Sequence, residues 1–309
     1  MKKIISLVLA ITLCLGACLG LTACGKEKTD FTVGVIQLME HESLDKATEG
    51  FTSALKAALE AEGKTVDVQV KVAGSADLCT TVATTFVSQN VDLIMANATP
   101  ALLAAANATT TIPVLGTSVT DYADTFANNI PANVSGTSDA VPFADQAQMM
   151  IDTLNLTAGD TVGVLYCSGE SNSKIQYEAV KALFEEKDIV VKAYTFSATT
   201  ELQTLTESAC GECKAIYIPS DNTVAENDAI VGTICNEKKT PVYTSYGGSI
   251  CYASLAIDYY KLGEETGKMA AEILLGNKTP ADIQVATLTP ATSFNKALCE
   301  TLGIEIPEA

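Results

Sequence analysis

The stretch Phe31-Thr-Val-Gly-Val-Ile-Gln-Leu38 opens the regular part of the chain, and its centre returns in Thr161-Val-Gly-Val-Leu-Tyr166. Both stretches are short, apolar and rich in valine, which is typical of a strand buried on both faces of a sheet. Apolar residues at helical spacing follow each stretch: Leu44, Ala47, Phe51, Leu55 and Leu59 after the first, and Ile175, Ala179, Leu183 and Phe184 after the second. The repeated strand and helix predict an α/β fold that starts twice.

The alternation continues outward from both stretches. We expect further strands at 66–72, 91–96, 112–115, 189–194, 214–218, 241–243 and 253–257, with helices at 76–89, 100–107 and 259–275. Two local echoes support a duplication, because 92–100 parallels 214–222 and 111–115 parallels 239–243. A boundary falls near 135–143, where Gly136 and Pro142 interrupt the periodicity. The pattern predicts two Rossmann-like lobes, each built on a parallel sheet.

The end of the chain decides how the lobes are connected. The strand at 253–257 and the helix at 259–275 come after the second alternation is complete, so we expect them to return to the first lobe. Lobe 1 would then comprise 31–138 plus 253–282, and lobe 2 would comprise 139–252 plus 283–309. The chain would cross between the lobes three times. Such a three-crossover hinge lets two rigid lobes close over a cleft.

The N-terminus has the order of a secretory signal. Lys2 and Lys3 precede a long apolar stretch that ends in Leu21-Thr-Ala-Cys24, and we expect 1–23 to be a signal peptide. Cys24 after Leu-x-Ala resembles a bacterial lipobox, which implies a lipid on Cys24 and a tether over 24–30. The alternatives are an ordinary signal peptide or a membrane-spanning helix over 4–23. The first reading anchors the protein to the outer face of the cytoplasmic membrane.

Composition narrows the classes of function. Without 1–23 the 19 basic residues lose Lys2 and Lys3, and 17 basic against 37 acidic residues give a formal charge of −20. A chain this acidic repels nucleic acid, so we expect no nucleic-acid partner. The sequence has one His, no Gly-x-Ser-x-Gly and no Walker A loop, which argues against an enzyme, a His-pair zinc site and the ATPase of a transporter. We predict no catalytic residue, no metal and no cofactor.

Seven of the ten cysteines remain after the signal peptide and Cys24 are set aside. An odd number cannot all pair, and most lie in apolar patterns as small buried residues do. The spacing Cys210-Gly-Glu-Cys213 is redox-like, but we place it in the turn between a helix and a strand, which leaves an oxidoreductase site as a minor alternative.

Polar residues follow the carboxyl ends of the predicted strands, where parallel sheets bind ligands. Each alone is most simply a helix cap, but as a set converging on one edge of two sheets they indicate a binding site. The candidates are Gln37, Glu40, His41, Thr99, Thr120, Asp121, Asp139, Glu170, Asn172, Ser173, Asp221, Asn222, Ser245, Tyr246 and Asp258.

Several of these blocks resemble one protein family. Gln37…Glu40-His41, Ser118-Val-Thr-Asp121, Gly169-Glu-Ser-Asn-Ser173, Ile218-Pro-Ser-Asp-Asn222 and Ile257-Asp-Tyr-Tyr260 resemble substrate-binding lipoproteins of ABC importers, in the subfamily associated with tryptophan, tyrosine and phenylalanine uptake. The resemblance implies a type I periplasmic-binding-protein fold that holds an aromatic amino acid between its lobes and delivers it to permease subunits as a monomer. Relatives often carry an acidic residue in the block matching 245–249, and this chain has none there.

The residue types suit an amino acid. Asp121, Asp221 and Asp258 offer charge for an ammonium, and hydroxyls and amides at helix N-termini (Thr99, Thr120, Asn172 and Ser173) offer donors for a carboxylate. Burying an aromatic ring gives roughly 4–6 kcal/mol, whereas a micromolar complex needs about 8 kcal/mol, so polar contacts must supply the difference. A nucleoside or sugar ligand, and a sensor that serves a signalling receptor, remain the alternatives.

Overall fold

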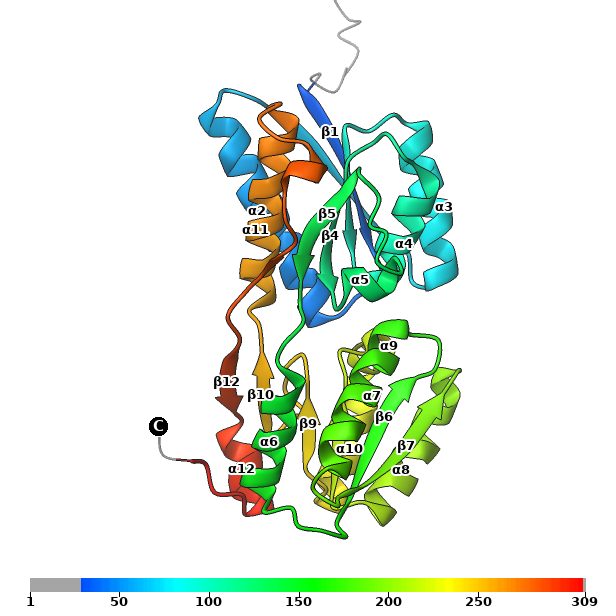
Figure 1. The fold of residues 1–309 in the computed structure, drawn as a ribbon, viewed down its shortest axis with the longest axis vertical. Helices are drawn as coiled ribbons and strands as arrows, with labels where there is room; N and C mark the ends of the chain where they lie inside the picture. Colours follow the sequence, from blue (N-terminus) through cyan, green and yellow to red (C-terminus); the bar gives the residue numbers. More distant parts are fainter. Residues whose placement is uncertain (1–28, 308–309) are drawn as a thin grey trace, which may run out of the picture. The chain divides into compact units, whose positions relative to one another are not determined.

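Two six-stranded sheets organise the described residues, 29–307, of the computed structural model (Figure 1). The first sheet has the order β11-β5-β4-β3-β1-β2, and all its neighbouring strands are parallel. Its strands are β1 (Phe31–Gln37), β2 (Val66–Val72), β3 (Leu93–Asn97), β4 (Val114–Val119), β5 (Val134–Ser138) and β11 (Ala286–Thr287). The signal peptide over 1–23, Cys24 and most of the tether lie outside the described residues.

The second sheet repeats this arrangement in the order β12-β10-β9-β8-β6-β7, with only β12 antiparallel to its neighbour among the strands described. Its strands are β6 (Thr161–Cys167), β7 (Val190–Phe196), β8 (Ala215–Ile218), β9 (Val242–Thr244), β10 (Ala253–Ala256) and β12 (Ala291–Phe294). The α/β class and the two mostly parallel sheets are confirmed. Residues 31–309 form a compact unit by themselves.

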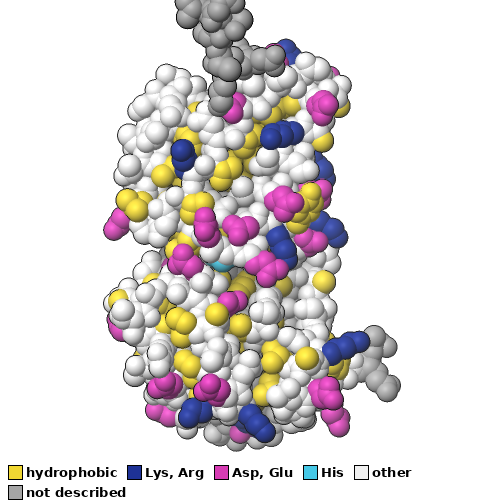
Figure 2. All heavy atoms as spheres, turned by 180° about the vertical axis from the view of Figure 1, so that it is seen from behind, with side chains coloured by type: hydrophobic (Ala, Val, Ile, Leu, Met, Phe, Trp, Pro, Cys, Tyr) yellow, Lys and Arg dark blue, Asp and Glu magenta, His cyan; other side chains and the backbone are white. Residues whose placement is uncertain are grey.

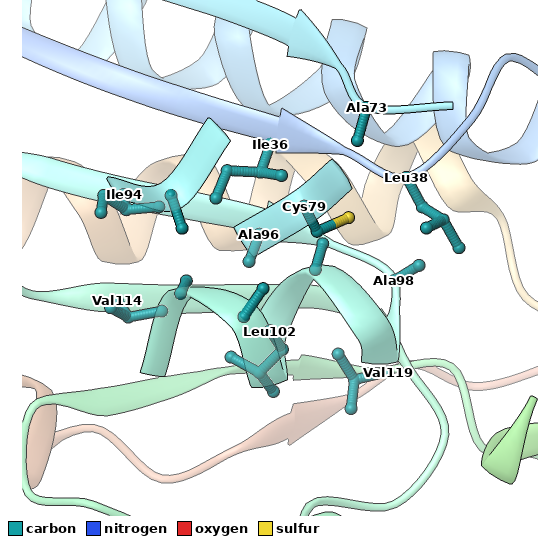
Figure 3. Packing of buried hydrophobic residues seen from close by; sticks show 14 of the residues in the cluster. Ile36, Leu38, Ala73, Cys79, Ile94, Ala96, Ala98, Leu102, Val114 and Val119 are labelled. Atoms are coloured by element: carbon teal, nitrogen blue, oxygen red, sulfur yellow. The ribbon is translucent and has the colours of Figure 1, made fainter. Parts of the chain in front are cut away.

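Helices cover both faces of each sheet, because the central strands are apolar and buried on both sides. In the first lobe α3 (Ala76–Ser88) and α4 (Thr99–Ala108) close one core, seen in Figure 3, and α2 (Glu42–Ala61) and α11 (Tyr259–Leu274) close the other. In the second lobe one core lies under α8 (Leu202–Glu212), α9 (Asn222–Glu226) and α10 (Asp228–Lys238), and the other under α6 (Phe143–Leu154), α7 (Ser171–Glu185) and α12 (Lys296–Leu302).

The predicted lobe boundaries are wrong in the last part of the chain. The strand at 253–257 was assigned to lobe 1, but β10 pairs with β9 and β12 and therefore belongs to the second sheet. Conversely, β11 pairs with β5, which keeps 286–287 in the first sheet. An apolar run in the sequence indicates a buried strand. It does not indicate which sheet the strand joins, because that depends on pairing with strands distant in sequence. The chain still passes between the sheets three times, at 139–142, 257–258 and 288–290.

The helix pair α2–α11 is packed unusually closely through glycines. A Cβ added to Gly263 would lie 2.0 Å from the carbonyl oxygen of Ala47, and one added to Gly50 would lie 2.0 Å from that of Tyr260. Only hydrogen atoms fit in these contacts, so the backbones of the two helices touch. This pair forms the outer wall of the first lobe and carries the second crossover at its α11 end.

Two other sequence expectations change. The boundary region near 135–143 contains β5 and the start of α6, which the interruption by Gly136 and Pro142 concealed. Cys210 lies in the last turn of α8, and Cys213 caps that helix, so the pair is not confined to a turn as predicted. In addition, a short helix, α5 (Tyr122–Thr125), follows β4, which extends to Val119.

Candidate functional site

A narrow cavity of about 10 Å³ lies between the carboxyl ends of the two sheets. The first lobe and its crossovers contribute His41, Ser43, Leu44, Ser118, Thr120, Asp139 and Tyr259, and the second lobe contributes Asn172, Ser220, Asp221, Asn222, Ala225 and Tyr246. This is the edge at which the sequence predicts a site. Neither lobe lines the cavity alone, so any ligand held there would contact both.

Side chains bridge the lobes beside the cavity. His41 Nε2 in the first lobe lies 3.3 Å from Asn222 Oδ1 in the second, and Gln176 donates weakly to Thr120 Oγ1 across 3.5 Å. His41 occupies the N-cap of α2 without capping it, which leaves its ring free to reach the other lobe. The lobes are therefore in contact around the cavity.

Glu170 organises the face of the second lobe. One carboxylate oxygen accepts from the backbone N–H of Asn222 at 3.0 Å, from its side-chain amide at 2.7 Å and from the amide of Asn172 at 3.1 Å. The other oxygen accepts from the backbone N–H and the hydroxyl of Thr223 at 2.8 and 2.7 Å. Five donors on one buried carboxylate fix the starts of α7 and α9 relative to each other.

Asp221 is engaged within its own lobe. It accepts from the backbone N–H of Cys167 at 2.8 Å, from the hydroxyl of Ser173 at 2.7 Å and from the backbone N–H of Val224 at 2.8 Å, so it caps α9. Burial and the neighbouring charge of Glu170 raise the pKa of Asp221 to about 8. Asp221 lines the cavity, but two of its three donors are backbone N–H groups and one of them starts α9, so its geometry suits a structural cap better than the ammonium contact that the sequence suggests.

The face of the first lobe is less tightly bonded. Ser118 has a positive φ of 55°, where the register of β4 shifts against β5, a backbone conformation that costs free energy for any residue with a side chain. Asp139 accepts from the hydroxyls of Thr120 at 3.2 Å and Tyr259 at 3.0 Å, and burial raises its pKa. Asp139 also lines the cavity, so it places an acidic group on the first-lobe side of the site.

Atoms without hydrogen-bond partners collect in this cavity. Among the described side chains, five buried polar atoms lack a partner: His41 Nδ1, Asn97 Oδ1, Ser118 Oγ, Asn172 Oδ1 and Tyr246 OH. All except Asn97 belong to residues that line the cavity. Most buried polar groups in proteins are paired, so four in one cavity indicate a surface built to bond a ligand.

Other predicted residues do not line the cavity. Gln37 bonds within the first lobe to Asp45 and Thr48, and Asp121 and Asp258 cap α5 and α11. Glu40 is exposed, while Thr99 is buried at the start of α4. Glu170, Ser173 and Ser245 stand behind the lining residues and bond to them.

Six lining residues were absent from the predicted set: Ser43, Leu44, Ser118, Ser220, Ala225 and, at the second crossover, Tyr259. Ser118 lies near the carboxyl end of β4 and Ser220 just after β8, and these positions were a usable signal. Leu44 and Ala225 are apolar helix residues, indistinguishable in sequence from core.

A wider, solvent-open pocket of about 560 Å³ adjoins the cavity and shares His41, Ser43, Ala225, Tyr246 and Tyr259 with it. Its rim carries four acidic residues, Glu42, Glu49, Asp228 and Asp258, against the one basic Lys46. Figure 2 shows the imidazole in the hollow between the lobes with acidic side chains around it. This pocket is the mouth of the site.

Comparison with known proteins identifies the family. The family model for ABC transporter substrate binding proteins matches residues 32–309. The chain belongs to this family. Members are substrate-binding proteins, and the expectation that the chain is not an enzyme is confirmed on that ground. A curated relative, the tyrosine-binding protein of Clostridioides difficile (strain R20291), is 36% identical over 310 residues, covering 93% of this chain and 88% of the relative.

Two solved structures differ in how well they superpose. A Streptococcus pneumoniae ABC domain in complex with L-Trp has a TM-score of 0.82 at 31% identity, over 91% of this chain and 97% of that one. The ligand-free, open structure of a Clostridium difficile substrate binding protein with adhesive properties has a TM-score of 0.65 at 32% identity, over 90% and 96%. At nearly equal identity, this chain superposes better on the L-Trp complex than on the ligand-free, open structure.

The substrate-binding proteins of ABC transporters act outside the cytoplasmic membrane. Within residues 29–307, no helix is long and apolar enough to span a bilayer.

Proposed function

We propose that this protein is a lipid-anchored extracytoplasmic receptor that captures an aromatic amino acid between its lobes and delivers it to an ABC importer. The observation that carries the proposal is the set of four partnerless polar atoms in a cavity that also holds Asp139, Tyr246 and Tyr259. Acceptors for an ammonium and aromatic surface for a ring occur in one space. The names of the relatives, which bind tyrosine or L-Trp, support the same ligand class.

The distribution of groups suggests how the ligand lies. Asp139, Asn172, Ser118 and Thr120 line only the inner cavity, while His41, Tyr246 and Tyr259 also line the mouth. The amino and carboxylate groups would meet the polar inner end, and the ring would lie toward the aromatic end. The ammonium ligands predicted from the sequence were Asp121, Asp221 and Asp258, whose carboxylates cap helices. Asp139 would bind the ammonium in their place.

A thermal-shift screen of residues 26–309 tests the ligand. All twenty amino acids, several nucleosides and several sugars would be compared at saturating concentration. A ligand that binds only the folded state stabilises it by ~2.7 kcal/mol at a hundredfold excess over Kd, so a true ligand stands out. A shift with tyrosine, tryptophan or phenylalanine supports the proposal. A shift only with a nucleoside or sugar overturns the ligand assignment.

The anchor is tested separately. Cys24→Ala in the full chain should abolish incorporation of labelled fatty acid and release the protein from the membrane fraction. Retention of the label on the variant would place the lipid elsewhere. Deleting the gene for this protein in its host should then reduce uptake of the labelled amino acid if the protein serves import. Uptake should be unchanged if the protein serves a signalling receptor.

A further inference from the structure

Glu170 fixes which atoms of two asparagines face the ligand. A carboxylate or a carbonyl oxygen only accepts hydrogen bonds, so the group that faces it must be the amide nitrogen. Asn172 Nδ2 faces Glu170 at 3.1 Å and the carbonyl of Ser220 at 2.7 Å, and Asn222 Nδ2 faces Glu170 at 2.7 Å. The carbonyl oxygens of both asparagines therefore point away from Glu170, and that of Asn172 has no partner.

The same constraint sets the tautomer of His41. Asn222 Oδ1, being an acceptor, requires a proton on His41 Nε2, which lies 3.3 Å away. Burial lowers the pKa of His41, so its imidazole is neutral near pH 7. In a neutral ring with the proton on Nε2, the other nitrogen is an acceptor. His41 Nδ1 is buried and has no partner.

The cavity therefore presents two separate fixed acceptors. Asn172 lines only the inner cavity, beside Asp139, whereas His41 lies at the aromatic end that continues into the mouth. A ligand must bring a donor to each acceptor, since a buried acceptor left unpaired is costly. An ammonium satisfies the inner one, and the other needs a donor on the side chain.

We propose that His41 Nδ1 accepts a hydrogen bond from the ring of the ligand, and that the receptor therefore selects aromatic amino acids with a ring O–H or N–H over phenylalanine. This inference rests on the proposed function and assigns His41 as its specificity-determining residue. A site built to bond a ring donor discriminates strongly against the analogue that lacks it, because its own polar group is then left unpaired.

Ligand pairs test the donor requirement by calorimetry on residues 26–309. Tyrosine is compared with phenylalanine and 4-fluorophenylalanine, and tryptophan with 3-benzothienylalanine, in which sulfur replaces the indole N–H. We expect at least one donor-bearing ligand to bind roughly 100-fold tighter than its donor-free partner. Equal affinities within both pairs overturn the inference while keeping the proposed function. Binding of no amino acid overturns the proposed function itself.

Two variants separate the acceptor from the bridge between the lobes. His41→Asn places an amide where Nδ1 was and loses the contact with Asn222, so every affinity should fall while most of the discrimination remains. His41→Gln places its amide where Nε2 was, so the contact with Asn222 is kept and the preference for a donor-bearing ligand over its donor-free partner should drop to less than about tenfold. If His41→Gln keeps the full preference for donor-bearing ligands, or weakens the binding of all ligands equally, His41 does not bond the ring of the ligand and the inference fails.

Discussion

The two faces of the cleft are built differently. On the second lobe, Glu170 and Asp221 accept eight hydrogen bonds between them, and the helix starts that carry Asn172 and Asn222 are tied together. On the first lobe Ser118 has a strained backbone conformation and a hydroxyl without a partner, and His41 contacts the other lobe without capping its own helix. Both faces keep partnerless atoms, Asn172 Oδ1 and Tyr246 OH on the second lobe and Ser118 Oγ and His41 Nδ1 on the first. Only on the second lobe does a network around two carboxylates hold the helix starts behind them in place.

The contrast extends to what holds each lobe together. The first lobe depends on close backbone packing of α2 against α11, where glycines permit contact. The cleft face of the second lobe depends on a buried polar network, which is rigid only while all its members are present. Changes to packing should therefore damage the first lobe most, and changes to a single carboxylate should damage the second.

The largest effect is expected for Glu170→Ala. The change leaves at least two buried backbone N–H groups without an acceptor, at a cost of roughly 1–3 kcal/mol each, and the amide and hydroxyl donors lose theirs as well. The free energy of unfolding should therefore fall by about 3–5 kcal/mol. Urea denaturation measures it. The matched control is Glu185→Ala, whose half-exposed carboxylate pairs only with Lys181 at the surface; it should cost less than about 1 kcal/mol. Equal losses would show that the network is not what stabilises this face.

Next in size is Gly263→Ala in the first lobe. The added methyl group would meet the Ala47 carbonyl at 2.0 Å, and separating the helices should cost about 2–3 kcal/mol of unfolding free energy. Gly211→Ala in α8 provides the opposite case, because no atom lies within 4 Å of the added carbon. That variant should gain about 0.5 kcal/mol through helix propensity. If Gly263→Ala leaves the free energy of unfolding unchanged in the same denaturation assay, the close packing of α2 against α11 is refuted.

Ser118→Gly should separate stability from binding. Glycine accepts the positive φ without strain, so the unfolding free energy of the empty protein should change by less than about 1 kcal/mol. Losing the hydroxyl should weaken the ligand about tenfold, the value of one hydrogen bond. Calorimetry on Ser118→Ala, which lacks the same hydroxyl, should give the same loss. Unchanged affinity in both variants would exclude Ser118 from the contact set.

The smallest effect concerns thiol chemistry, which also differs between lobes. Cys210 in the second lobe accepts from the thiol of Cys235, which lowers its pKa to about 7, whereas burial raises the pKa of Cys79 in the first lobe to about 11. The thiolate fraction of Cys210 rises as pH increases through 7, so iodoacetamide should label it first, with a midpoint near pH 7 by mass spectrometry. Cys235→Ala should move that midpoint upward. Faster labelling of Cys79 would contradict the assignment.

Much of the fold could be predicted because it rests on local periodicity. The strand at 66–72 has the predicted bounds, and the helix predicted at 76–89 is one residue shorter. The assignment of β10 to a sheet could not be predicted, since its partners β9 and β12 are chosen by the tertiary structure. The strand β5 was missed because Gly136, needed where its backbone adopts a positive φ against Gly116, reads as a break.

The candidate site was predictable in location but not in role. Asp121 and Asp139 both follow strands of the first lobe, yet Asp121 caps α5 and only Asp139 lines the cavity. Likewise Asp221 looks like a ligand group in sequence, and its oxygens are bonded within the lobe. Which way a carboxylate points depends on donors brought from elsewhere in the chain. The acceptor role of His41 depends on Glu170, far away in sequence.

The contact between His41 and Asn222 has a kinetic consequence. With the lobes touching, the space between their polar faces is only about 10 Å³, room for a water molecule, so an amino acid can enter or leave only after the lobes separate. The residence time is then set by how often the hinge opens, and two ligands of unequal affinity can share one escape rate. A transporter that separates the lobes would release the ligand without having to replace any of the contacts that the ligand makes inside the cleft.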